Sequence, residues 1–106
     1  MTREQKEKMD VIINFLRENQ IASYLGYKGG IKVNPDLYIP KHKIMVKISE
    51  GKEKDDIFFH KVKYKYHPLF IREAETKEFV LEKMQNLIID LMKQKQKRYE
   101  KMKGNS

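Results

Sequence analysis

Residues 34–51, NPDLYIPKHKIMVKISEG, decide the fold of this chain. The run IMVKIS at residues 44–49 is almost continuously apolar, which is typical of a strand that is covered on both faces. Before it, DLYI reads as a shorter strand bounded by Pro35 and Pro40, because proline cannot donate a hydrogen bond to a ladder. The intervening KHK predicts a turn. Two neighbouring strands therefore form the predicted centre of the fold.

Further elements are predicted on either side of this centre. Thr2 and Gln5 form a capping box, and apolar residues recur at helical spacing from Met9 to Leu16. The glycine-rich YLGYKGG predicts a hairpin turn, and Thr76 is placed to cap the last helix. The elements predicted in this way are helices at residues 3–19 and from 77 to roughly 100, and strands at residues 31–33 and 67–72.

Residues 56–66 fit two patterns. The run KVKYKY alternates as a strand with outward lysines would, whereas Phe58 and Val62 recur at helical spacing. The order of the surrounding elements favours the helix, with EGKEKDD before it as a loop and an aspartate at position 55 or 56 as its cap. The chain is therefore predicted to be an α+β protein of order α-β-β-β-α-β-α, with a small mixed β-sheet flanked by helices.

The length of 106 residues suffices for one domain, and 40% hydrophobic residues allow a modest core. We assign residues 1–92 to this domain and residues 93–106 to a basic helical extension with a frayed C-terminus. The chain lacks cysteine, a run near the ~20 apolar residues that span a bilayer, and the apolar segment of a signal peptide. These features predict a cytoplasmic protein without a membrane partner.

The net charge is +8, and much of it lies near the C-terminus. KQKQKRYEKMK at residues 93–103 holds five lysines, one arginine and one glutamate, which leaves +5 there. Lysine and arginine neutralise phosphates and release counterions, so the segment predicts a nucleic-acid partner, with DNA expected, although a solvated helix end would carry the same charges. The residues predicted to contact nucleic acid are Lys47, Lys61, Lys63, Lys65, Arg72, Lys93, Lys95, Lys97 and Arg98.

The order of elements, together with the segments PDLYIP, KIMVKIS, DD and PLFIR, resembles the PD-(D/E)XK restriction-endonuclease-like superfamily, and within it the small Vsr-like and DUF559-type domains. The resemblance covers about residues 5–92. It implies a nuclease-like fold in which two acids on adjacent strands bind Mg²⁺, and in which a nearby lysine orients water or stabilises developing negative charge.

The resemblance places Asp36 as the first acid and Lys47 as the lysine, but Met45 occupies the position of the second acid. Glu50 is the candidate replacement, so the implied catalytic set is Asp36, Lys47 and Glu50, with Asp36 as the metal ligand if the site is active. As a turn residue, Asp36 would need no catalytic role. We expect a catalytically degenerate module without a cofactor. The alternative is an active Mg²⁺-dependent nuclease.

Two further interpretations stay open. Tyr64 and Tyr66 alternate with lysines and could form a stacking platform for single strands, although an edge strand with protective lysines explains them as well. The last helix carries apolar residues on more than one face, among them Leu81, Ile89 and Met92. This pattern favours a protein-interaction or homo-oligomerisation module as a third function.

Overall fold

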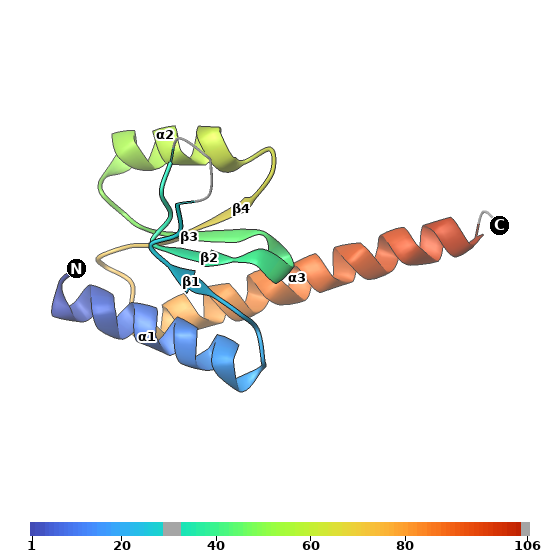
Figure 1. The fold of residues 1–106 in the computed structure, drawn as a ribbon, viewed down its shortest axis with the longest axis horizontal. Coiled ribbons are helices and arrows are strands. Elements are labelled where there is room, and N and C mark those ends of the chain that lie inside the picture. The colour runs from blue at the N-terminus through green and yellow to red at the C-terminus, as the bar shows by residue number, and fades with distance from the viewer. Residues whose placement is uncertain (29–32, 105–106) are drawn as a thin grey trace.

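The computed structural model describes residues 1–28 and 33–104, with side chains as far as residue 99. Its described elements form three layers, in which α2 covers one face of a β-sheet while α1 and α3 cover the other (Figure 1). The predicted α+β class and element order are confirmed. The elements are α1 (Arg3–Glu18), β1 (Tyr24–Leu25), β2 (Leu37–Ile39), a 3₁₀ turn η1 (Pro40–His42), β3 (Ile44–Ile48), α2 (Lys52–Val62), β4 (His67–Ile71) and α3 (Lys77–Gly104).

Within the described residues the sheet has four strands in the order β1-β2-β3-β4. The first three strands form an antiparallel meander, in which Tyr38 of β2 lies opposite Met45 of β3. Strand β4 then pairs parallel to β3, with Lys47 opposite Phe70, and α2 is the crossover between these two strands. The sheet is therefore mixed, as predicted, and β3 is an inner strand.

Alternation of side chains along the strands creates one core on each face of the sheet. On one face Met45 packs with Phe58 and Val62 of α2. On the other face the strands contribute Leu37, Ile39, Ile44, Val46, Ile48, Leu69 and Ile71, which pack on Met9, Ile12 and Leu16 of α1 and on Val80, Met84, Ile88 and Leu91 of α3. The strand predicted at residues 44–49, covered on both faces, is confirmed as β3 at Ile44–Ile48.

The predicted helix caps are present. Thr2 Oγ1 accepts the backbone N–H of Gln5 at 3.2 Å, and the Gln5 side chain accepts the N–H of Thr2 at 2.9 Å, which completes the capping box of α1. Thr76 Oγ1 accepts the N–H of Phe79 at 3.1 Å at the start of α3. Both helices therefore begin where the sequence predicts.

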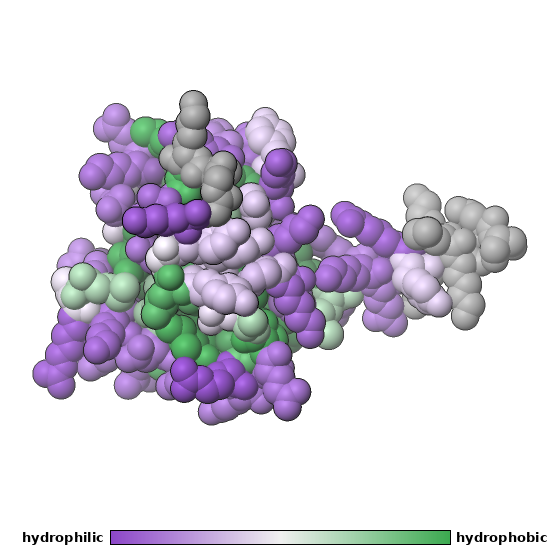
Figure 2. Space-filling view, viewed as in Figure 1, coloured by the Kyte–Doolittle hydropathy of each residue, from purple (hydrophilic) through white to green (hydrophobic). Residues whose placement is uncertain are grey.

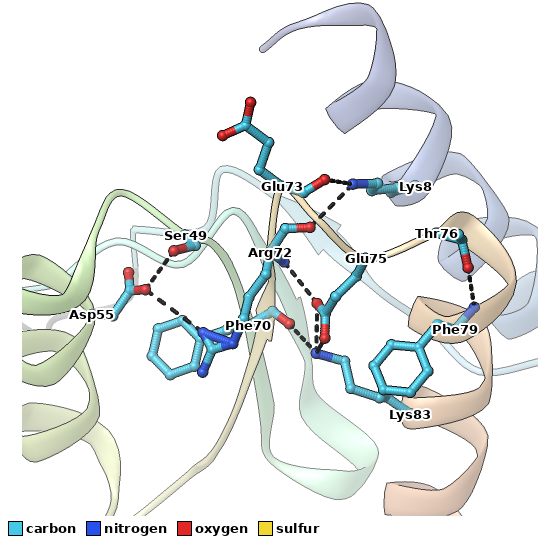
Figure 3. Close-up of polar contacts among 10 residues, drawn as sticks. All are labelled: Lys8, Ser49, Asp55, Phe70, Arg72, Glu73, Glu75, Thr76, Phe79 and Lys83. Atoms are coloured by element: carbon cyan, nitrogen blue, oxygen red, sulfur yellow. Dashed lines mark hydrogen bonds and ion pairs between the residues drawn. The ribbon is translucent and has the colours of Figure 1, made fainter.

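Two lysines hold the segment that follows β4 (Figure 3). The buried Lys8 of α1 donates from Nζ to the carbonyl oxygens of Arg72 and Glu73, at 3.1 and 3.0 Å. From α3, Lys83 donates to the carbonyl oxygen of Phe70 at 2.6 Å. Both helices therefore bind the carboxyl end of β4 or the backbone directly after it.

Helix α2 is confirmed in place of the alternative strand, but it begins at Lys52 and not at residue 56, and it ends at Val62. The prediction of a loop in EGKEKDD and of an aspartate cap is thus wrong. Gly51 is the N-cap, with a φ of 110° that lets the chain turn directly after β3. Asp55 lies inside the first turn and accepts the N–H of Glu50 at 3.1 Å, which favours the earlier start.

Strand β1 lies at Tyr24–Leu25, inside the segment that we predicted as a hairpin turn. It pairs with Tyr38 and Leu37 of β2, and Gly26 follows with a φ of 61°, a conformation that suits glycine. The predicted strand at residues 31–33 is not confirmed: residues 31 and 32 lie outside the described part of the chain, and Val33 belongs to no strand.

Helix α3 continues without a break past residue 92, so the predicted basic extension is the outer part of this helix (Figure 1). The side chains from Met92 to Tyr99 are all exposed. Figure 2 shows that hydrophilic side chains predominate along the protruding helix. Among the described residues, no helix is long and apolar enough to cross a membrane.

Candidate functional site

Asp36 lies directly before β2 and has a structural role. Its N–H donates to the carbonyl oxygen of Val46 at 2.9 Å, which extends the ladder with β3 beyond the end of β2. Its carboxylate oxygen Oδ2 accepts the backbone N–H of Ile48 at 2.7 Å. Because β2 begins only at Leu37, the Asp36 side chain supplies the acceptor that a longer strand would have supplied.

The three predicted catalytic residues lie together at the carboxyl end of β3, with Lys47 between Asp36 and Glu50. Its Nζ lies 3.7 Å from Asp36 Oδ2 and 3.9 Å from Glu50 Oε2, and its side chain is only 19% exposed. We call Asp36, Lys47 and Glu50 the acid–lysine cluster. A hollow of about 220 Å³ beside it is lined by Met1, Gln5, Asp36, Ile48, Ser49 and Glu50.

Met45 is fully buried and packs against Phe58 and Val62 of α2. Mg²⁺ prefers oxygen ligands, which a thioether cannot provide. The position where the resemblance expects a second acid is therefore occupied by a core side chain. In this protein the second carboxylate near Lys47 comes from Glu50, after the end of the strand.

Asp55 and Arg72 form a second polar group, which also lies near the carboxyl ends of β3 and β4 (Figure 3). The Asp55 carboxylate is buried and accepts the Ser49 hydroxyl at 2.5 Å and the Glu50 N–H at 3.1 Å. The Arg72 guanidinium lies 3.9 Å from Asp55 Oδ2 and over the Phe70 ring at 5.4 Å. Arg72, predicted to contact nucleic acid, thus already has an acidic partner within the protein.

Among the described side chains, those of residues 1–28 and 33–99, no three of histidine, aspartate or glutamate converge in a way that could hold a metal ion. The acid–lysine cluster offers two carboxylates, those of Asp36 and Glu50. Because Mg²⁺ is often held by one or two carboxylates together with water and substrate phosphate, these two residues are the ones that could hold it.

A basic groove lies at the other end of β3, where α3 leaves the body of the protein. Its volume is about 330 Å³. The walls come from the η1 turn, from the turn before β4 and from α3. The residues that line the basic groove are Lys41, His42, Lys43, Tyr64, Lys65, His67, Leu91, Gln94, Lys95 and Arg98.

The charges of the basic groove are concentrated and unbalanced. Of the ten described residues that line it, five are lysine or arginine and none is acidic. Burial, together with the charges of Lys95 and Lys41, lowers the pKa of His42 below its usual range. His42 is therefore mainly neutral at pH 7, and its shift shows that cations from η1 and α3 act on the same point.

The residues predicted to contact nucleic acid lie in separate parts of the structure. Lys65, Lys95 and Arg98 line the basic groove, while Lys47 and Arg72 lie beside carboxylates at the opposite end of the sheet. The remaining predicted cations are exposed outside the groove, on or directly after α2 and along α3; they are Lys61, Lys63, Lys93 and Lys97.

Sequence reasoning missed Lys41 and Lys43, which line the basic groove from the η1 turn. The signal was present in the turn KHK, where two lysines flank His42 directly before the central strand. What the sequence does not reveal is that this turn lies beside Lys95, more than fifty residues later in the chain.

The predicted stacking platform is divided by the fold. Tyr64 is 85% exposed and lines the basic groove, and the ammonium of Lys63 lies 5.0 Å from its ring centroid. Tyr66 turns inward and makes an edge-to-face contact with Tyr38 at 5.8 Å. Of the two rings, Tyr64 alone lines this groove.

The acid–lysine cluster and the basic groove thus lie at opposite ends of the parallel pair β3–β4. The cluster includes Lys47 at the carboxyl end of β3, whereas Lys43 and His67, at the amino ends of the two strands, line the groove.

Comparisons of the chain with protein-family models, with curated proteins and with solved structures find no match.

Proposed function

We propose that this chain is a nuclease-like module with an incomplete metal site that binds nucleic acid through its basic groove. The observation that carries the proposal is the convergence of five cations from three separate segments on one groove, with no acidic residue among the described side chains of its walls. Like charges that line one groove repel each other, so an arrangement of this kind is most favourable when an anion neutralises it. A phosphate backbone is an anion that can reach several cations at once.

The acid–lysine cluster supports a binding role over a catalytic one. It contains two carboxylates and one ammonium, so its formal charge is −1, which disfavours a phosphodiester in the absence of a metal. The buried Met45 closes the position at which the resemblance expects the second acid. Under this proposal phosphates approach the basic groove, and Lys47 serves mainly to neutralise Asp36 and Glu50.

The test is binding of a generic duplex and of a single strand, followed by fluorescence anisotropy across a salt series. We expect affinity at low salt, and the logarithm of the binding constant should fall linearly as the logarithm of the salt concentration rises. Lys65→Glu should weaken binding more than Lys61→Glu does, because Lys65 lines the groove while Lys61 lies outside it and the charge change is identical. Absence of binding at low salt, or affinity that salt does not change, would refute the proposal.

A second candidate function is Mg²⁺-dependent cleavage of nucleic acid at the acid–lysine cluster. The observation in its favour is the position of Glu50, whose carboxylate lies 3.9 Å from Lys47 and so stands near Asp36. Here Asp36 and Glu50 would hold Mg²⁺, which would polarise the phosphate and supply hydroxide, while Lys47 would stabilise the developing charge.

Cleavage of plasmid DNA and of RNA in Mg²⁺ or Mn²⁺ tests this candidate. Asp36→Asn and Glu50→Gln are the informative variants, because each removes one negative charge and preserves the size of the side chain. Activity that is lost in both variants would support this site. Activity of equal size in the wild type and in both variants would come from a contaminant.

A further inference from the structure

His42 has a buried ring nitrogen that the protein leaves without a partner. The side chain is 7% exposed, and among the described residues no hydrogen-bond partner is found for Nδ1. Buried polar atoms are paired in the large majority of cases, so an unpaired one calls for an explanation. His42 also follows directly from Pro40 and Lys41 in the η1 turn, which places it in the wall of the basic groove.

His42 also lines a second hollow, of about 460 Å³, which we call the apolar hollow. It lies between the end of α1 and the part of α3 where that helix leaves the body. Its lining residues are Phe15, Asn19, Ile21, Lys41, His42, Ile88, Met92 and Lys95. Three of them, Lys41, His42 and Lys95, also line the basic groove, so they form a ridge between the two spaces.

Because the ridge lines both spaces, the cationic basic groove lies directly beside the apolar hollow. A ligand that satisfies both must carry an anion next to a flat or apolar group. A nucleotide has this form, because its phosphate is followed by a base whose faces are apolar. In a duplex the bases are stacked and paired, so a base can enter a protein hollow only when it is unpaired or has been turned out of the helix.

We propose that the ridge of Lys41, His42 and Lys95 binds the phosphate of an unpaired nucleotide and that the apolar hollow receives its base. This inference rests on the proposed nucleic-acid binding and deepens it, since it assigns single strands as the preferred form. The ammonium groups of Lys41 and Lys95 contact the phosphate, and His42 forms the wall between them and the apolar hollow. The base packs between Phe15 and Ile21 on one side and Met92 on the other.

The first test uses the wild-type protein and two oligothymidylates of about 12 nucleotides, one intact and one in which abasic residues replace the bases. Both strands carry the same phosphates, so the phosphate contacts of the basic groove cannot distinguish them. The comparison is repeated in Tyr64→Ser, because Tyr64 lines the groove and its exposed ring could also stack on a base. We expect the intact strand to bind about tenfold more tightly, because the abasic strand loses the base contacts. Equal affinities would overturn the assignment of the hollow while leaving phosphate binding by the groove intact.

The second test compares Met92→Glu with Ile89→Glu. Both positions lie on α3 and are well exposed, at 57% and 48%, and both substitutions add one negative charge, but Met92 lines the apolar hollow and Ile89 does not. We expect Met92→Glu to weaken single-strand binding about tenfold more than Ile89→Glu does. On a duplex the two variants should have equal effects. Equal effects on the single strand would overturn the inference.

The outcomes separate this inference from the function on which it rests. If the protein binds neither strands nor duplexes, the proposed function fails, and the inference fails with it. If it binds both with a salt slope but does not distinguish intact from abasic strands, the inference alone fails. Thermal unfolding followed by circular dichroism establishes that both variants are folded before their affinities are compared.

Discussion

In the acid–lysine cluster, Nζ of Lys47 lies 3.7 Å from the same Asp36 oxygen, Oδ2, that accepts the backbone N–H of Ile48. The Asp36 carboxylate therefore accepts a hydrogen bond from the end of β3 and also lies close to the half-buried ammonium of Lys47. This arrangement gives Asp36 a part in stability that does not depend on any metal. It also means that loss of activity in an Asp36 variant is informative only if the fold is measured in the same variant.

Asp36→Ala should destabilise the protein by about 1–3 kcal/mol, because it leaves the Ile48 N–H without its acceptor and Lys47 with one carboxylate fewer. Urea unfolding followed by circular dichroism measures the change. Glu50→Ala is the control, since its exposed carboxylate meets Lys47 only at 3.9 Å and should change stability by about 0.5 kcal/mol or less. Equal losses in the two variants would contradict the structural role of Asp36.

A second prediction concerns Lys8, which holds the segment after β4. Lys8→Met keeps an unbranched chain in the buried space but removes the donors to the carbonyl oxygens of Arg72 and Glu73. We expect a loss of about 1–3 kcal/mol in the free energy of unfolding, because hydrogen bonds to charged groups contribute at this level.

Lys6→Met is the matched control for Lys8→Met, because Lys6 lies on the same helix and is exposed. It should leave the urea midpoint almost unchanged. If Lys8→Met were no more destabilising than Lys6→Met, the contacts between α1 and the end of β4 would contribute nothing measurable.

The sequence predicts the parts of this fold that depend on short-range patterns. The capping box at Thr2, the cap at Thr76 and the buried run of β3 all follow from neighbouring residues. The start of α2 was missed because Gly51 reads as an ordinary loop residue, whereas its positive φ lets the helix begin at once. Strand β1 was missed because two residues carry too little pattern to be recognised.

Of the two candidate sites, the acid–lysine cluster was predicted and the basic groove was not. Resemblance alone brought Asp36, Lys47 and Glu50 into one set, and the structure brings them within ion-pair distance. The basic groove escaped prediction because its cations come from segments that meet only when α3 packs on the sheet. The charge of the sequence is concentrated in residues 93–103, which is why nucleic-acid contacts were predicted there. Lys41 and Lys43, which also line the groove, come from a turn beside the central strand.

His42 makes stability depend on pH. Its pKa is lowered in the folded protein, first by burial and then by Lys95 and Lys41, so the unfolded chain takes up a proton at a higher pH than the folded chain does. The stability associated with neutral His42 is therefore fully present above the ordinary histidine pKa of about 6.5 and is lost as the pH falls below it.

Urea unfolding at about pH 7.5 and about pH 5.5 tests this dependence against a His42→Asn variant. We expect the wild type to lose more stability over this interval than the variant, which cannot titrate at this position. His60 and His67 are retained in both proteins and so contribute equally to the comparison. The same loss in both proteins would mean that His42 does not cause the pH dependence.

The last prediction separates the basic groove from the general charge of α3. Lys93 and Lys95 stand two residues apart on this helix, and both are exposed, but only Lys95 lines the groove. If phosphates bind in the groove, Lys95→Gln removes a phosphate contact and should lower the magnitude of the salt slope by about 1, whereas Lys93→Gln should leave it unchanged. The two variants have the same net charge, so any difference between them reports position alone. Equal reductions in the slope would show that the helix attracts nucleic acid by its overall charge, and equal slopes in all three proteins would place the phosphate contacts elsewhere on the molecule.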